Sequence, residues 1–326
     1  MRHSASQAVT SCAAAAVVSL LAVSAAYAQK AQIPAIAASA ASAATAPTLA
    51  KSPGSIIPPE IRADNAPCAN ANALGVARVV EIDTTGGPGF GFEHFKAYDF
   101  LRMNEVVLTF DDGPWPTTTP AVLAALSSHC TKATFFPVGK HATWHPDILR
   151  QVAEQGHTIG SHTWSHADLS KKSIEEAKEE IEKGVSAVRI ALGAPAAPFF
   201  RFPSLKHPPE LMNYLGERNI GVFSTDMDSF DFKMRKPDQV VKSVMAKLRK
   251  FGKGIVLMHD FQHATADGLA DLLGELKANG YKIVHMRAKA PVETIATYDA
   301  MMAGEFKGGG TASRPVSSVV RTISGE

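Results

Sequence analysis

Hydrophobic residues along the chain gather in short runs that are separated by longer stretches of mixed polarity. Seven runs are rich in β-branched or aromatic residues and are predicted to be strands: Val106–Phe110, Ala133–Val138, His157–Gly160, Phe199–Phe202, Gly221–Thr225, Ile255–His259 and Lys282–His285. Strands that alternate with helices are typical of parallel sheets with right-handed crossovers. We therefore expect an α/β domain whose strands form a closed or nearly closed barrel.

The clearest helix is predicted to follow Ser173, which begins a Ser-x-x-Glu capping box with Glu176. From Ile174 to Val188, apolar residues recur every three or four positions, so one face of this helix is apolar. Gly193 is a typical residue just beyond a helix end. Two shorter segments are also predicted to be helical: Pro120–Ser127 and Asp147–Gln155.

The first residues have the three parts of a secretory signal peptide. Arg2 supplies a positive charge, residues 13–26 are apolar apart from serines, and Ala26-Tyr27-Ala28 places small residues two positions apart. The apolar run is shorter than the ~20 residues that a membrane-spanning helix requires. We expect residues 1–28 to be cleaved, with an uncleaved anchor as the alternative. The mature protein would be periplasmic or extracellular, without stable membrane insertion.

Composition divides the remaining chain into three parts. Residues 29–65 are rich in Ala, Ser and Pro and are expected to be a flexible linker. Residues 66–298 are expected to form one folded domain, and residues 299–326 a disordered tail. The formal net charge of +2 is too small to indicate a nucleic-acid partner, which usually requires a concentrated basic patch.

Two of the three cysteines, Cys68 and Cys130, lie outside the expected signal peptide. An even number of cysteines in an exported protein is compatible with a disulfide. Two buried free thiols are an equally good interpretation. The spacing does not resemble that of a zinc finger.

Polar residues that could take part in catalysis or metal binding lie at the ends of five of the predicted strands. They are Asp111, Asp112, His162, Arg201, Asp228, Asp231 and His259. In a β/α barrel, active residues collect where strands end and loops begin. We therefore expect these side chains, although distant in sequence, to converge on one mouth of the barrel.

His162 and His166 are four residues apart, a spacing that would bring two imidazoles together on one face of a helical turn. With one aspartate and an open position, such a pair is typical of a catalytic metal site. Asp111 and Asp112 offer the carboxylates, one to bind the metal and one to accept a proton. Two surface histidines, and an aspartate pair in a turn, are the structural alternatives.

His259 ends the apolar run that begins at Ile255. Burial disfavours a charged imidazole unless an acidic group lies nearby, and Asp231 could be that group. The pair would then be a general acid held in one tautomer. A hydrogen-bonded core histidine is the alternative.

Other conspicuous residues do not by themselves indicate a function. The glycine-rich segment 86–91 lacks the spacing of a nucleotide-binding motif and is expected to be a loop. His207 and His263 are interpreted as solvated loop histidines. Trp115 and Trp144 could stack on sugar rings or pack within the protein, and the sequence does not separate these two roles.

Together, these segments resemble carbohydrate esterase family 4, the NodB-homology polysaccharide deacetylases. Its five ordered motifs have counterparts here: Thr109–Pro114 (TFDDGP), His162–His166 (HTWSH), Arg201–Ser204 (RFPS), Asp228–Phe232 (DSFDF) and Leu257–His259 (LMH). The resemblance spans residues 104–286 or so. It implies the distorted (β/α)7 barrel of that family.

The resemblance also implies a divalent metal ion bound by Asp112, His162 and His166, and zinc is the ion that we expect. In the first motif of the family, the leading aspartate is the catalytic base. This role falls on Asp111, and the arginine that orients the base is Arg201.

The remaining motifs imply the catalytic acid and the substrate pocket. His259 would be the acid and Asp231 the residue that orients it. The backbone N–H of Ser204 would stabilise the oxyanion, Leu257 would form part of the acetyl pocket, and Phe232 would line the sugar groove.

The third and fourth motifs depart from the family pattern. Phe202 replaces a proline, Ser204 and Leu205 replace an aromatic residue and a glycine, and Phe232 replaces a tryptophan. Phe232 keeps an apolar wall but lacks the indole N–H. Ser204 still offers a backbone N–H, which only proline would lack.

The function implied is metal-dependent removal of N-acetyl groups, with release of acetate, from an N-acetylated glycan such as chitin oligomers or peptidoglycan. Two alternatives remain open. One is an O-acetyl esterase that acts on acetylated xylan, and the other is a non-catalytic glycan-binding protein on the same fold.

Overall fold

A computed structural model describes residue 68 and residues 70–309. The expected signal peptide and linker, and the end of the expected tail, lie outside these residues. The described residues belong to one compact unit. None of its described helices combines the length and apolar character needed to cross a bilayer.

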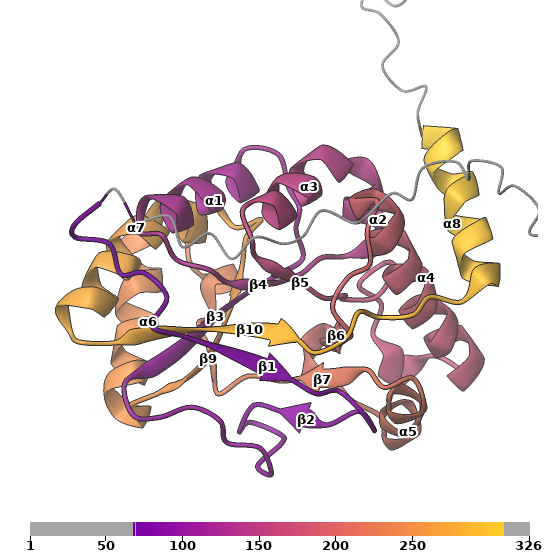
Figure 1. The fold of residues 1–326 in the computed structure, drawn as a ribbon, viewed down its shortest axis with the longest axis horizontal. Coiled ribbons are helices and arrows are strands. Elements are labelled where there is room, and N and C mark those ends of the chain that lie inside the picture. Colours follow the sequence, from indigo (N-terminus) through magenta and orange to yellow (C-terminus); the bar gives the residue numbers. More distant parts are fainter. Residues whose placement is uncertain (1–67, 69, 310–326) are drawn as a thin grey trace, which may run out of the picture. The chain divides into compact units, whose positions relative to one another are not determined.

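Within the described residues, ten strands form two sheets in which every pair is parallel (Figure 1). The larger sheet contains β1 (Arg78–Ile82), β10 (Lys282–Ala288), β3 (Glu105–Asp111), β4 (Thr134–Phe136), β5 (Thr158–Ile159), β9 (Gly254–His259) and β8 (Met227–Asp228). The smaller contains β2 (Gly89–Phe90), β7 (Gly221–Phe223) and β6 (Phe199–Phe200). A bridge between Ser161 and Phe200 links the two sheets.

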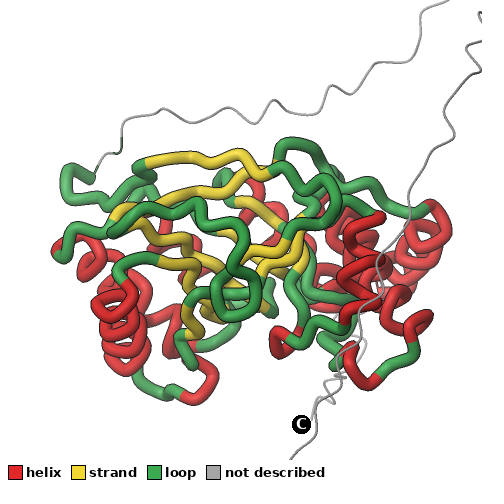
Figure 2. The backbone as a smooth tube through the Cα atoms, turned by 90° about the horizontal axis from the view of Figure 1, so that it is seen from below, coloured by secondary structure: helices red, strands yellow, loops and turns green. Residues whose placement is uncertain are grey.

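The helices lie to either side of these strands (Figure 2). They are α1 (Thr118–Ser128), α2 (Gly139–Trp144), α3 (Pro146–Glu154), α4 (Ile174–Leu192), α5 (Pro209–Glu217), α6 (Pro237–Phe251), α7 (His263–Ala278) and α8 (Ala296–Gly309). Helices α1, α6 and α7 pack together, as do α2, α4 and α8. The alternation of strands and helices confirms the predicted α/β class, while closure of a seven-stranded ring stays a prediction.

All seven predicted strands are present, and three short strands escaped prediction. Strand β1 is half exposed, and β2 and β8 have two residues each, too few for a periodic pattern. The segment 86–91 is therefore not wholly a loop, because Gly89 and Phe90 pair with β7. Pairing with a neighbour, and not local hydrophobicity, defines these strands.

Helix α4 begins and ends as predicted. The Ser173 side chain accepts a hydrogen bond from the Glu176 N–H, the Glu176 side chain accepts one from the Ser173 N–H, and Gly193 adopts a left-handed conformation with φ of 70°. The disordered tail, in contrast, was predicted to begin at residue 299, which lies inside a helix. Helix α8 continues to Gly309 and buries Met302, and Asp299 pairs with Arg189 of α4.

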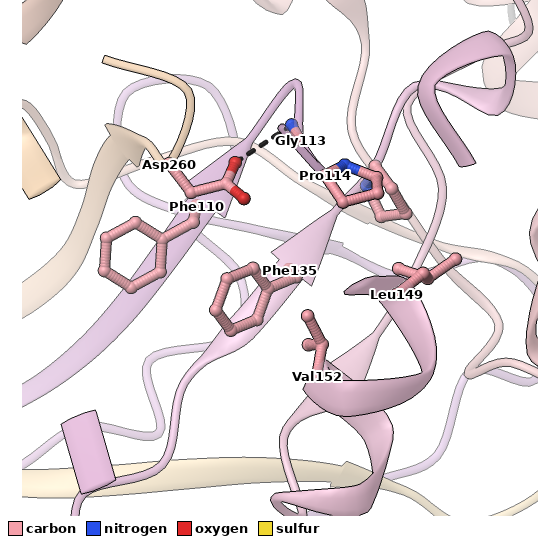
Figure 3. A pocket seen from close by; sticks show the side chains of 8 residues that line it. Phe110, Gly113, Pro114, Phe135, Leu149, Val152 and Asp260 are labelled. Atoms are coloured by element: carbon pink, nitrogen blue, oxygen red, sulfur yellow. Dashed lines mark hydrogen bonds between the residues drawn. The ribbon is translucent and has the colours of Figure 1, made fainter. Parts of the chain in front are cut away.

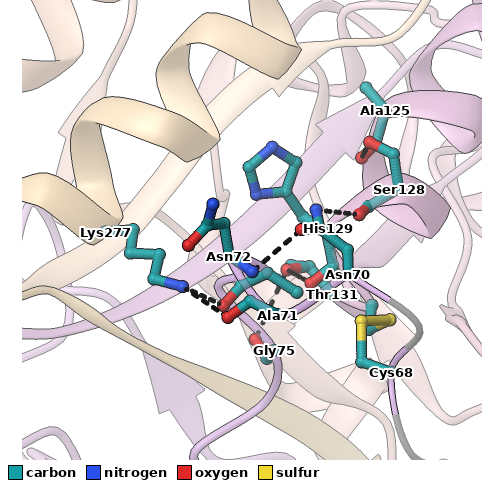
Figure 4. The surroundings of a disulfide bond; sticks show 12 residues. Cys68, Asn70, Ala71, Asn72, Gly75, Ala125, Ser128, His129, Thr131 and Lys277 are labelled. Atoms are coloured by element: carbon teal, nitrogen blue, oxygen red, sulfur yellow. Dashed lines mark hydrogen bonds between the residues drawn. A yellow bond between two sulfur atoms is a disulfide. The ribbon is translucent and has the colours of Figure 1, made fainter.

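Cys68 and Cys130 form a disulfide, with Cα atoms 5.9 Å apart (Figure 4). Around it, the Asn70 side chain donates to the Ser128 carbonyl, and Lys277 donates to the Ala73 carbonyl at 2.9 Å. These contacts attach the segment before β1 to the end of α1 and to α7. Cys130 precedes β4, so the disulfide lies at the amino ends of the strands.

Strand β3 is buried along its whole length, which explains its uninterrupted apolar run. It lies between β9 and β4, since both pair with its residues Thr109–Asp111. Asp111 is its last residue. The carboxylate of Asp111 therefore lies at the carboxyl-terminal edge of the sheet, at the end of a buried strand.

Candidate metal and acid–base site

The predicted site residues meet at the carboxyl ends of the strands. Asp111 and His259 are register partners at the ends of β3 and β9. His162 follows β5, Arg201 follows β6, and Asp231 follows β8. The predicted convergence of these strand ends is thus present in the structure.

Asp112, His162 and His166 form a cluster whose candidate ligand atoms all lie within 4.8 Å of one another. The Asp112 Oδ1 atom is 3.5 Å from His162 Nε2 and 3.4 Å from His166 Nε2. This oxygen is buried and has no hydrogen-bond partner among the described residues. A buried carboxylate oxygen without a donor is costly, and a cation would satisfy it.

His162 is prepared for ligation by its neighbours. Burial lowers its pKa to about 3, despite the opposing charge of Asp112, so the imidazole is neutral at pH 7. Its Nδ1 atom lies 2.7 Å from the Arg201 carbonyl, which accepts a hydrogen bond only if Nδ1 carries the proton. The lone pair is then on Nε2, the atom that faces Asp112. The donor set of two imidazoles and one carboxylate fits a divalent cation such as zinc.

The two histidines do not lie on a helical turn, and that expectation was wrong. Thr163 and His166 have left-handed backbone conformations, with φ of 67° and 58°. The Thr163 side chain accepts a hydrogen bond from the His166 N–H at 3.0 Å. This bend, and not helical periodicity, brings the imidazole rings of His162 and His166 to a centroid distance of 5.0 Å.

Arg201 is completely buried and pairs with Asp111 through a 2.7 Å bond from Nη1 to Oδ1. Its remaining donors reach the Thr109 hydroxyl and the backbone carbonyls of Phe223 and Ser224. Burial raises the pKa of Asp111, while the charges of Arg201 and His259 oppose that rise. Arg201 thus fixes the carboxylate in place, and burial keeps it a better proton acceptor than an exposed aspartate.

His259 and Asp231 form a tightly bonded pair. The Nδ1 atom of His259 donates to Asp231 Oδ1 at 2.7 Å, its backbone N–H donates to Oδ2, and Thr265 also donates to Oδ2. Burial lowers the pKa of His259, but the hydrogen bond and charge of Asp231, with the charges of Asp112 and Asp111, outweigh it and raise the pKa to about 9. His259 is therefore protonated at neutral pH, and its Nε2 lies 3.9 Å from Asp112.

The three expected substrate-binding residues occupy different positions. Phe232 is 48% exposed, and its ring packs edge-on against His259 at 5.7 Å. Leu257 is buried on β9, two residues before His259 and on the same face of the strand. Ser204 lies exposed on a turn after β6, with φ of 54°. No contact in the described chain joins Ser204 to the acid or base, so its role stays a proposal.

The next residue in that turn, Leu205, also has a positive φ, 58°. Its carbonyl accepts a hydrogen bond from His207 Nδ1 at 2.8 Å. The His207 ring packs against His94 at 4.4 Å. His207 is thus part of the framework of the turn and not a solvated loop histidine, whereas His263 is exposed as expected.

Asp260 was missed by the sequence analysis. It is completely buried beneath the turn after β3, where Oδ1 accepts a hydrogen bond from the Gly113 N–H at 2.9 Å (Figure 3). Its Oδ2 atom accepts one from the Thr119 hydroxyl at 2.6 Å. A Cβ atom at Gly113 would overlap its carboxylate. The pairing of Asp260 with a glycine therefore fixes the turn after β3.

The profile of the polysaccharide deacetylase family matches residues 101–221. The chain is 37% identical over 182 residues to a peptidoglycan-N-acetylglucosamine deacetylase of Listeria monocytogenes, covering 55% of this chain and 37% of that protein. Identity to a peptidoglycan-N-acetylglucosamine deacetylase of Bacillus cereus is 32%, over 60% of this chain and 72% of that protein. A chitooligosaccharide deacetylase of Azorhizobium caulinodans is 30% identical, with coverages of 49% and 75%.

Solved structures of polysaccharide deacetylases are also similar to this chain. Bdellovibrio bacteriovorus peptidoglycan deacetylase Bd3279 superposes with a TM-score of 0.60 and 34% identity, covering 66% of this chain and 59% of that one. A carbohydrate esterase family 4 pseudoenzyme of Bacillus anthracis superposes with a TM-score of 0.52 and 25% identity, with coverages of 56% and 63%. The protein belongs to the polysaccharide deacetylase family, and the predicted NodB-type α/β fold is confirmed.

Proposed function

We propose that the protein hydrolyses N-acetyl groups of a glycan that contains N-acetylglucosamine, releasing acetate and a free amine. One arrangement carries this proposal. A base fixed by Arg201, a three-ligand cation site and an acid fixed by Asp231 surround one small volume at the strand ends. The chain spans 37% of the length of the Listeria monocytogenes relative.

Asp112, His162 and His166 are the residues that would bind the metal, and zinc is the ion that we propose. When bound, such an ion polarises the acyl oxygen and lowers the pKa of water, which promotes attack on an amide carbon. The protein's own side chains accept and donate the protons.

Asp111 takes the proton from the attacking water. Its carboxylate is held by Arg201, and burial raises its pKa, so it is a stronger base than an ordinary aspartate. Because Arg201 occupies Oδ1, the other carboxylate oxygen is the one left to receive the proton. The water oxygen then forms the new bond to the acetamide carbon.

His259 returns a proton at the next step. Its Nδ1 is engaged by Asp231, which leaves the Nε2–H as the donor that faces the site. Cleavage of the C–N bond expels the amine, and this proton neutralises it, giving acetate and an amino sugar. The Ser204 N–H would stabilise the oxyanion before that cleavage, while Leu257 and Phe232 would contact the acetyl group and the sugar.

Two other functions remain to be separated from this one. An O-acetyl esterase would use the same groups, because an ester is cleaved more easily than an amide. The similar structures include a pseudoenzyme, that of Bacillus anthracis. Against a non-catalytic function, this chain keeps the Arg201–Asp111 and Asp231–His259 pairs, and the contacts of Asp112 with the two histidines of the proposed metal site.

Export is also part of the proposal. It rests on the signal-like residues 1–28 and on a disulfide, which persists in an oxidising compartment. Peptidoglycan would then be within reach in the periplasm or at the cell exterior. Two of the relatives carry peptidoglycan-N-acetylglucosamine deacetylase in their names, which makes this polymer our first choice of substrate.

The test is acetate release from three polymers: peptidoglycan, chitin oligomers and acetylated xylan. We expect release from at least one of the first two and little from xylan. Asp111→Asn serves as the matched control, since it keeps the shape of the side chain and removes the base. Release from xylan alone would favour the esterase, and no release from any of the three would favour the non-catalytic function.

A further inference from the structure

A cluster of aromatic rings lies beside the candidate site, and the proposed function does not use it. Trp115 is 39% exposed and Trp144 57% exposed. The His141 ring contacts both, at centroid distances of 5.2 Å from Trp115 and 5.1 Å from Trp144, and His145 packs edge-on against Trp115 at 5.8 Å. Single exposed aromatic residues are common, but a contiguous patch of them usually marks a binding surface.

This aromatic cluster is attached directly to the candidate metal site. His141 Nδ1 donates to the Asp112 carbonyl at 2.5 Å. The first two N–H groups of α2, at Gly139 and Lys140, donate to the carbonyls of Thr163 and Trp164, in the bend between the two metal-binding histidines. The cluster therefore has a fixed position relative to Asp112, His162 and His166.

The order of the strands places this cluster on one side of the site and a second aromatic pair on the other. Strands β8, β9, β3 and β4 are consecutive neighbours. Phe230 and Phe232 follow β8, whereas Trp144 lies on α2, which follows β4. Strands β8 and β4 are three inter-strand steps of about 4.8 Å apart, on the order of 14 Å. The reacting groups on β9 and β3 lie between them.

We propose that Trp115, Trp144, His141 and His145 form a subsite for a sugar unit of the same glycan that lies beyond the immediate neighbour of the unit that reacts. This proposal rests on the proposed function, because it extends that site. Because the strands that lead to the two aromatic groups are farther apart than the width of one hexose ring, an extended chain would be needed to contact both groups.

The chemistry of the cluster suits a neutral sugar. The C–H bonds on the face of a pyranose are electropositive and match the negative face of an indole ring. Because the Nδ1 proton of His141 is donated to the Asp112 carbonyl, its Nε2 can accept a hydrogen bond from a sugar hydroxyl, and the His145 imidazole can donate or accept one. The four rings that contact one another carry no carboxylate or ammonium group, so they do not select for an anionic or cationic polymer.

The test compares fully acetylated chitin oligomers of two and six units. Trp144→Ala should reduce the ratio of kcat/KM for the hexamer to that for the dimer by about fivefold, the effect of losing one aromatic contact of ordinary strength. Trp144→Phe should restore most of the ratio. Phe251→Ala is the matched control, because Phe251 is 50% exposed but lies before β9, at the opposite ends of the strands.

A binding measurement makes the proposal independent of turnover. Calorimetric titration with the hexamer compares the Asp111→Asn protein with the double variant that also carries Trp144→Ala. The double variant should bind the hexamer about fivefold more weakly. If the unmodified protein releases no acetate but this loss of affinity is seen, the proposed function fails and the subsite stands.

Three results would overturn the proposal. One is an equal loss for dimer and hexamer, which would indicate a structural role for Trp144. Another is an equal change in Phe251→Ala. The third is a Trp144→Ala variant in which neither the kcat/KM ratio nor the affinity for the hexamer changes. If that variant at the same time lost binding to phosphatidylglycerol vesicles, the cluster would be assigned to a membrane surface instead.

Discussion

Asp111 and His259 are register partners at the ends of two adjacent parallel strands, β3 and β9. Because register partners point to the same side of a sheet, the proposed base and the proposed acid share one pocket. Each side chain also has a partner behind it, Arg201 for Asp111 and Asp231 for His259. The sheet therefore sets the spacing between the base and the acid, and the buried partners set their charges.

Substitution of the base should separate chemistry from metal binding. Asp111→Asn should lower acetate release by about 10²–10⁴-fold, the usual contribution of a general base, and should retain bound zinc. His162→Ala should lose both. Elemental analysis of the purified variants, alongside acetate release, distinguishes the two. Turnover in Asp111→Asn equal to that of the unmodified protein would rule out the role given to Asp111.

Asp231→Asn should move the alkaline limit of activity to lower pH. Asp231 is the main group that raises the pKa of His259, to about 9, against the opposing effect of burial. The acidic form of His259 is present below that pKa and is lost as the pH rises through it, so a lower pKa ends activity earlier. A pH profile of kcat for both proteins provides the check. An unchanged alkaline limit would mean that His259 does not supply the proton.

Asp260→Ala should weaken both folding and catalysis. The change leaves the buried Gly113 N–H and the Thr119 hydroxyl without an acceptor, and an unsatisfied buried group costs about 1–3 kcal/mol. It also frees the turn that carries Asp112. Asp260→Asn, which keeps one acceptor, should be milder. Urea unfolding and acetate release measure the two effects, and a fully stable, fully active Asp260→Ala protein would contradict the positioning role.

Removal of the disulfide should affect stability far more than activity. Cys68 and Cys130 are 62 residues apart, and in the chain-entropy treatment a loop of that length is worth ~4 kcal/mol. Because the bond lies at the amino ends of the strands, the double serine variant should keep its kcat where it remains folded. Intact-mass measurement with and without reductant establishes the bond first. Two free thiols in exported protein would refute the pairing.

The sequence predicted the location of the site because its residues follow conspicuous apolar runs. Strand β3 is buried on every side, so its run is unbroken, and the polarity changes abruptly at Asp111. The same holds for His259 at the end of β9. Where a buried strand ends, a short pattern is sufficient to place a functional side chain.

Other parts depend on contacts that no local pattern reveals. Asp260 follows His259 in sequence, but its role comes from Gly113 and Thr119, which are more than a hundred residues away. The bend at Thr163 and His166 uses left-handed residues that are not glycine, so its shape carries no signal in the sequence. Strand β8 is defined only by its pairing with β9.

Acetate release from acetylated chitin hexamer through a cycle of metal removal and return tests the central claim most directly. Activity should be lost after dialysis against a chelator and restored by about one equivalent of zinc per chain, with no restoration in His162→Ala. Undiminished acetate release by protein shown to be free of metal would contradict the account.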